Sequence, residues 1–305
     1  AGADAVVDAD AGTVVCPAGA TLKELLTACP NAPLVPSPAL ASALTSNATA
    51  MGDVIALDGL AEGTAPCQPV AVCTPNDAPS LLFSDSPEEP AQDGVLYADT
   101  VPAGRHRFYV YHANGGAAAR KFPIVVLNQG AQDTSLTIRR HGLAAPSKAY
   151  VSVGKTVLLD WLAPQQVAKV VTVPAGTRVL LDPALDALHA DKAELVHAIY
   201  DVETTAPLKV SFVSVLANAD AVAATAGLPL LTRDPDHQRG TFANADVVLA
   251  FQADAPKNGI RHLRLGGDET DKTLTGIDAP TGDAQKLLGN YGVLYRVVAT
   301  PTPCA

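Results

Sequence analysis

The hydrophobic and polar positions of this chain follow a two-residue period over many short segments. The densest run spans residues 104–216, where Pro, Gly and Asn turns separate one segment from the next. Within residues 105–112, Phe108 and Val110 share one face and Tyr109 lies on the other, because successive residues of a strand point to opposite sides. Such segments at this spacing predict a mainly β fold, an antiparallel β-sandwich, rather than alternating strands and helices.

Other segments of the same kind extend this prediction along the chain. Strands are expected at 94–101, 122–127, 135–139, 153–162, 167–173, 178–181, 195–202, 208–216, 247–252, 260–265 and 292–300, and a short helix at 219–226. The phrase Val-Pro-Ala-Gly occurs at 101–104 and again at 173–176. Since Pro suits the second place of a turn and Gly the fourth, each copy predicts a tight reversal between antiparallel strands.

Three regions follow from these patterns. Residues 1–93 form an acidic, Cys- and Pro-rich N-terminal segment, with one or two short helices expected at 21–28 and 39–50. Residues 94–216 form the central sandwich. Residues 217–305 either complete that sandwich or build a smaller second sheet.

Charge is distributed unevenly over the chain. The formal net charge is −10, with −12 on residues 1–103, +4 on 104–216 and −2 on 217–305. The acidic total argues against nucleic acid and against anionic membrane surfaces as partners, and no apolar run is long enough for a transmembrane helix. This asymmetry has three interpretations: it steers head-to-tail association between subunits, it draws the acidic N-terminal segment onto its own sandwich, or the acidic surface is simply solvated.

The five cysteines bear on the compartment. Cys16, Cys29, Cys67 and Cys73 lie in the first part of the chain without metal-type spacing. Disulfides in an oxidising compartment are therefore expected, although three pairings are open. Cys304 remains, and it is either free, paired with a cysteine of the N-terminal segment, or cross-linked to another chain. The small, polar first residues are typical of a chain left after signal cleavage, so the predicted location is extracellular or on the cell surface.

One acidic segment is a candidate cation site. Asp268, Glu269, Asp271 and Asp278 lie close together in sequence, and calcium would neutralise such carboxylates through oxygen ligands. A solvated hairpin tip is the alternative. Calcium is the one cofactor that the sequence suggests.

Catalytic motifs are not found. The chain has no nucleophile elbow, phosphate-binding loop or zinc-protease motif, so we expect no enzyme. His106 and His112 share a predicted face but lie about 20 Å apart along a strand, too far to bind one metal. Aromatic residues make up 5% of the chain and the single tryptophan, Trp161, is expected in the core.

Three short phrases carry a resemblance to a known group of proteins. The sequence at 289–297, with 239–242 and 275–278, is similar to secreted bacterial β-modules, found at times beside stalk domains like the N-terminal domain of copper amine oxidases. The resemblance implies an exported, surface-associated β-module without activity. Asn290 and Tyr291 resemble the quinone-forming motif of copper amine oxidases, but Gly292 stands where the acid belongs, and we reject that enzyme.

Two functional hypotheses follow. The first is a non-catalytic structural subunit of an extracellular fibre, sheath or surface layer, whose partner is a second copy of the chain. The second is a soluble module that binds carbohydrate of the cell wall, with or without calcium.

Overall fold

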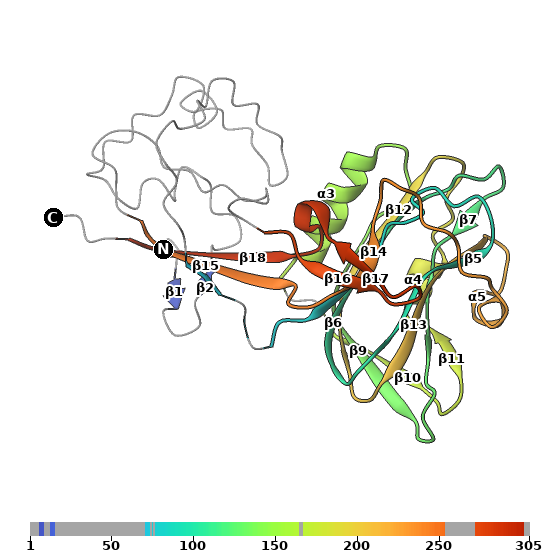
Figure 1. The fold of residues 1–305 in the computed structure, drawn as a ribbon, viewed down its shortest axis with the longest axis horizontal. Helices are drawn as coiled ribbons and strands as arrows, with labels where there is room; N and C mark the ends of the chain where they lie inside the picture. The colour runs from blue at the N-terminus through green and yellow to red at the C-terminus, as the bar shows by residue number, and fades with distance from the viewer. Residues whose placement is uncertain are drawn as a thin grey trace. The chain divides into compact units, whose positions relative to one another are not determined.

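The computed structural model describes residues 6–8, 13–15, 71–73, 75, 77–164, 167–253 and 272–301. The chain divides into two compact units (Figure 1). The large unit comprises residues 76–245 and 272–293, and the small unit comprises residues 1–75, 246–271 and 294–305. These boundaries fall at other places than residues 93 and 216, where the sequence was divided.

The large unit contains an eight-stranded sheet. Its order is β10 (Lys169–Val173), β9 (Thr134–Leu143), β12 (Leu195–Thr204), β6 (Gly104–Ala113), β4 (Ser80–Ser84), β14 (Arg239–Phe242), β16 (Thr275–Asp278) and β17 (Asp283–Lys286). Neighbouring strands are antiparallel apart from β4 and β6, which are parallel. The strictly antiparallel arrangement expected from the sequence is therefore wrong at this pair.

A second sheet of five strands belongs to the same unit. Its order is β11 (Arg178–Leu180), β8 (Ile124–Leu127), β13 (Leu208–Leu216) and β5 (Gly94–Val101), and β7 (Arg120–Lys121) also pairs with β13. The prediction of a mainly β fold is confirmed.

One hydrophobic core serves both sheets. Phe108 and Val110 of β6 and Phe212 of β13 are buried in it, and the rings of Phe108 and Phe212 meet edge to face with centroids 6.1 Å apart. Arg107, Tyr109 and Tyr111 alternate with these residues and point to the opposite face, as the alternation predicts. Burying each large apolar side chain contributes roughly 2 kcal/mol, so this shared core holds the two layers together.

The two Pro-Ala-Gly turns differ from the hairpins expected from sequence. The turn at 102–104 leads from β5 to β6, and the turn at 174–176 leads from β10 to β11. In both cases the two strands belong to different sheets. Gly104 and Gly176 adopt φ angles of 134° and 68°, which only glycine takes readily. These turns are corners that carry the chain from one layer to the other.

The predicted strand at 153–162 is wrong, because this segment is part of helix α3 (Tyr150–Trp161). Val153, Val157 and Trp161 recur every four residues and form its buried face, which is the period of a helix. The helix packs on β9 and β12. A Cβ at Gly142 of β9 would lie 2.1 Å from the carbonyl oxygen of Val157, so this glycine permits the contact.

The remaining helices of the large unit are short. They are α4 (Pro183–Asp186), α5 (Ala221–Ala224) and the 3₁₀ turn η1 (Leu288–Asn290). Helix α5 lies inside the range predicted for it but is shorter. In the described part of the chain, no helix has both the length and the apolar character needed to cross a membrane.

The small unit contains two pieces of sheet. Strands β1 (Val6–Asp8) and β2 (Thr13–Val15) form an antiparallel pair. Strand β15 (Asp246–Ala253) lies between β18 (Leu294–Pro301), to which it is parallel, and β3 (Ala71–Cys73), to which it is antiparallel. The helices expected at 21–28 and 39–50 and the strand expected at 260–265 lie outside the described residues.

Candidate functional site

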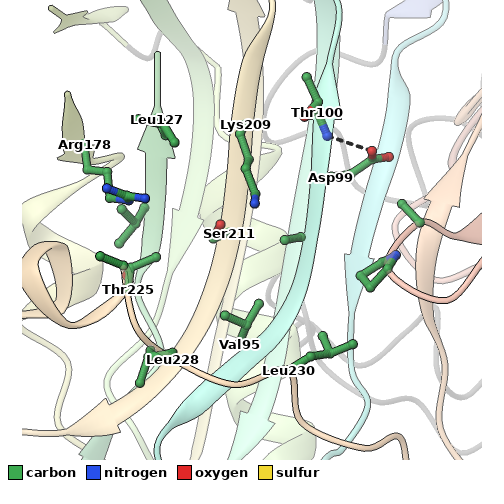
Figure 2. A pocket seen from close by; sticks show the side chains of 15 residues that line it. Val95, Asp99, Thr100, Leu127, Arg178, Lys209, Ser211, Thr225, Leu228 and Leu230 are labelled. Carbon is green, nitrogen blue, oxygen red and sulfur yellow. Dashed lines mark hydrogen bonds between the residues drawn. The ribbon is translucent and has the colours of Figure 1, made fainter. Parts of the chain in front are cut away.

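A pocket of about 440 Å³ lies on the five-stranded sheet (Figure 2). Its floor is formed by β5, β13, β8 and β11, and its walls by residues 225–230 and by the β16–β17 turn at 279–280. This is the face of the sheet turned away from the shared core. Pockets of a few hundred Å³ are typical of sites that hold small molecules. We call this feature the sheet pocket.

The register of the strands decides which side chains form the floor. Arg178 of β11 pairs with Leu127 of β8, Leu127 pairs with Lys209 of β13, and Lys209 pairs with Thr100 of β5. Directly paired residues point to the same face of a sheet. One cross-strand row therefore places two cations, one on either side of an apolar residue, on the floor of the pocket.

The next row that faces the pocket contains Ser211. This residue of β13 pairs with Val125 of β8 and with Ala98 of β5. Ser211 is 6% exposed, and its hydroxyl makes no hydrogen bond within the described part of the chain. Because a hydroxyl both donates and accepts, it offers a polar contact to a ligand at the bottom of the pocket.

The walls are held by the chain that follows α5. The backbone of this segment pairs with the free edge of β5, since the Val95 amide donates to Pro229 and the Leu231 amide donates to Val95 at 2.8 Å each. Gly94 lets the two approach, because a Cβ there would lie 2.3 Å from the Leu231 side chain. The loop from 225 to 230 is thereby fixed across the sheet.

Arg239 connects this loop to the other wall. Its side chain is 1% exposed, and Nη1 donates to the carbonyl oxygens of Leu96 at 2.6 Å and Leu231 at 2.8 Å. Its Nε forms an ion pair with Asp278 at 3.2 Å, and Arg233 approaches the same carboxylate at 3.4 Å. One buried guanidinium therefore joins β5, the loop and the β16–β17 turn.

The charged groups of the sheet pocket have different surroundings. Arg178 and Lys209 form no ion pair within the described part of the chain, and Figure 2 shows both side chains reaching over the floor from separate strands. Asp99 lies at the rim, where its carboxylate accepts from the Thr100 amide at 2.7 Å and from the Thr241 hydroxyl at 2.6 Å. The cations are thus available to a ligand, whereas the carboxylate is already engaged.

The predicted calcium ligands are not brought together within the described residues. Asp278 is fully buried and paired with Arg239 and Arg233. Asp268, Glu269 and Asp271 lie outside the described residues, and the described part of the chain has no group of three side chains that could hold a metal ion. Calcium binding stays a prediction.

The predicted disulfides also stay predictions. Cys16, Cys29, Cys67 and Cys304 lie outside the described residues. The structure places only the backbone of Cys73, in β3.

The two histidines on the core face of β6 have structural surroundings. His106 Nδ1 lies 2.7 Å from Ser80 Oγ, and His112 Nε2 lies 2.9 Å from Ser84 Oγ. Burial lowers the pKa of both, for His112 to about 4. A neutral imidazole in the core is therefore the form that the fold selects.

A second polar cluster, which sequence reasoning missed, lies around the end of β4. Asp85 Oδ1 is buried and has no hydrogen-bond partner. Burial and the nearby charge of Glu88 raise the pKa of Asp85 to about 8, although His237 opposes the shift. His237 contacts Glu88 and Asp234. Its pKa is lowered by burial but raised, on balance, by these two carboxylates. Asp85 consequently titrates near neutral pH.

A comparison of the chain with protein-family models, with curated proteins and with solved structures finds no match. The resemblance to secreted bacterial β-modules therefore stays a prediction.

Proposed function

We propose that this chain is an exported, non-catalytic binding module that holds a saccharide of the cell wall or extracellular matrix in the sheet pocket. The observation that carries the proposal is the pocket itself, whose donors lie on the rigid floor of a sheet and whose walls are fixed by Arg239. Ligand sites need few polar groups when a scaffold holds them in place. The cysteines of the sequence, which suit an oxidising compartment, support the exported location.

A saccharide suits this lining for a chemical reason. Sugar rings have polar edges that accept hydrogen bonds and C–H faces that pack on apolar side chains. The sheet pocket offers both kinds of contact, with Ser211, Arg178 and Lys209 on one hand and Val95 and Leu230 on the other. A lining that is rich in donors and partly apolar is therefore matched to such a ligand.

Blocking the pocket tests the proposal. Ala226 is exposed and lines the wall, so Ala226→Trp would fill the cavity without disturbing the core. Ala223 is exposed on α5 but does not line the pocket, and Ala223→Trp is the matched control. We expect the wild type and Ala223→Trp to bind at least one oligosaccharide on a glycan array, and Ala226→Trp to lose that binding. A panel without any bound glycan, or binding that Ala226→Trp leaves intact, would overturn the proposal.

A specific observation favours the structural-subunit hypothesis as a second candidate. Strand β10 is the last strand at one end of the eight-stranded sheet within the described residues, and Val170 on it is 68% exposed. An exposed apolar edge strand is a template for pairing with another chain. We propose that, if copies assemble, this edge is where they meet.

Sedimentation and electron microscopy test the second candidate. Val170→Lys places a charge on the edge, and Val151→Lys, on a side chain 75% exposed in α3, is the control. Assemblies that Val170→Lys abolishes and Val151→Lys preserves would support it. A wild-type chain that stays monomeric as its concentration rises would refute it.

A further inference from the structure

We infer that the ligand group held at the floor of the sheet pocket is a compact oxyanion, a carboxylate or a phosphate, bound between Arg178 and Lys209. The inference rests on the proposed function, because it names the chemistry of the ligand for the same pocket. It begins from the cross-strand row that contains both cations.

The spacing of the row suits a single small anion. Arg178 and Lys209 are separated by one strand, and neighbouring strands lie about 4.8 Å apart, so their Cα atoms are about 10 Å apart. Both side chains are long enough to converge on a group placed above Leu127. Arginine presents parallel N–H donors to an oxyanion and lysine adds a point charge.

The charge around the row has no internal counterpart. Leu127, between the two cations, is apolar, and neither cation forms an ion pair within the described part of the chain. The carboxylate at the rim, Asp99, already accepts hydrogen bonds from the Thr100 amide and the Thr241 hydroxyl. Two like charges on one face repel each other. An anion between them would turn this repulsion into attraction.

The arrangement differs from that of other cations on the large unit. Arg107, Arg120, Lys121, Arg140 and Arg239 each form an ion pair with an aspartate of the same unit. The fold thus neutralises the cations that it buries, whereas Arg178 is half-buried, Lys209 is exposed, and both stay unpaired at the cavity within the described part of the chain. Ser211, one row away, adds a hydroxyl that can donate to the same oxyanion.

Titration calorimetry on the full chain tests the inference with three probes. Digalacturonate carries carboxylates, a neutral galactose disaccharide has a similar size without charge, and inorganic phosphate supplies the oxyanion without a sugar. The variants are Arg178→Met and Lys209→Met, which keep most of the apolar stem of the side chain and remove its charge. Lys192→Met is the control, since Lys192 is exposed and does not line the pocket.

We expect an anionic probe to bind, and each pocket variant to weaken its binding about tenfold, which is the usual value of one charge-assisted hydrogen bond. Lys192→Met should bind as the wild type does. Binding of digalacturonate identifies a carboxylated saccharide, whereas binding of phosphate alone supports the oxyanion and removes the saccharide of the proposed function.

Other outcomes overturn the inference. If the neutral disaccharide binds as tightly as digalacturonate, and Ala226→Trp abolishes both, the pocket is a saccharide site without anion selectivity. If Lys192→Met weakens binding as much as the pocket variants do, the effect is one of total charge and the row is not the site. If no probe binds, the inference and the proposed function both fail.

Discussion

Replacing Asp85 by asparagine is expected to stabilise the large unit at alkaline pH. The side chain of Asp85 ends in a buried oxygen without a partner, and its pKa is raised to about 8, first by burial and then by Glu88. The folded state therefore keeps a proton that the unfolded chain loses near pH 4. Since the unfolded state binds fewer protons between about pH 4 and pH 8, the free energy of unfolding falls as the pH rises through this window.

The size of the effect follows from the shift in pKa. A rise from 3.8 to about 8 corresponds to at most about 5 kcal/mol lost by pH 8. Water reaches part of the side chain and the surroundings relax when it ionises, so we expect a measurable loss of about 2 kcal/mol. Asparagine has nearly the same shape but does not ionise, so Asp85→Asn removes this loss.

Urea unfolding followed by tryptophan fluorescence is the assay. The single tryptophan, Trp161, lies in α3 of the large unit, so the signal reports on that unit. At about pH 4, where the window begins, the wild type and Asp85→Asn should have similar stability, and at about pH 8.5 the variant should be more stable by about 2 kcal/mol. Asp236→Asn, which changes an exposed carboxylate two residues after Asp234, should show no such pH-dependent gain.

The opposite outcome would refute the reasoning. If Asp85→Asn is less stable than the wild type at about pH 8.5, the ionised carboxylate contributes favourable contacts in the folded state. A difference that is equal at both pH values would show that asparagine changes packing and not titration.

Three further predictions concern the structure that supports the pocket and the core. Gly142→Ala should lower the free energy of unfolding by about 3 kcal/mol or more, because the new Cβ would lie 2.1 Å from a carbonyl oxygen of α3. The control Gly154→Ala, whose Cβ would meet nothing within 4 Å, should stabilise the helix slightly, and thermal unfolding compares the two variants. Arg239→Met should lower the free energy of unfolding by about 3–5 kcal/mol, because it leaves the buried carboxylate of Asp278 with Arg233 as a weaker partner. Arg139→Met, which removes an exposed ion pair, should lower it by less than about 1 kcal/mol, and urea unfolding measures both. His112, whose pKa is lowered to about 4, stabilises the fold above about pH 6.5, and this contribution is lost as the pH falls toward 4. In urea unfolding at several pH values, His112→Asn should reduce the loss of stability between about pH 6.5 and pH 4 by about 1–3 kcal/mol.

Local periodicity predicted the strands whose faces differ in polarity. In β13, Leu208, Val210 and Phe212 alternate with Lys209 and Ser211, so the sequence already places the last two on one face. The same rule predicted the two faces of β6. These assignments need no knowledge of the partner strand, because side-chain direction is a property of the strand itself.

The segment at 153–162 shows where periodicity is ambiguous. Its apolar residues include Val153, Val157 and Trp161, which suit a helix, and a run from 157 to 159 that suits a strand equally well. The packing of the helix on the sheet also depends on a residue elsewhere in the chain. Gly142 removes the side chain that would otherwise keep the helix backbone away from β9.

The sheet pocket was not predicted, because its charges meet through pairings between distant segments. Arg178 and Lys209 are 31 residues apart, and they share a face only because both β11 and β13 pair with β8 around Leu127. A shift of the register by one residue would turn one of the cations toward the core. The turns at 102–104 and 174–176 also concealed these pairings, because they carry the chain from one sheet to the other where the sequence suggested hairpins.

The partner of Asp278 was also not predicted, because it too comes from a distant segment, and this partner connects Asp278 to the sheet pocket. Seen in sequence, it belongs to a group of carboxylates that calcium would neutralise, but in the fold its charge is neutralised by Arg239, 39 residues away. A buried carboxylate that stays ionised needs a counter-ion, and here the counter-ion also bonds to the backbone of β5 and to the loop that forms one wall of the pocket. The residue therefore acts on the sheet pocket by holding its turn in place, and Asp278→Asn should weaken ligand binding through displacement of the wall even though it never touches the ligand. Binding that survives Asp278→Asn unchanged would show that the wall does not depend on this ion pair.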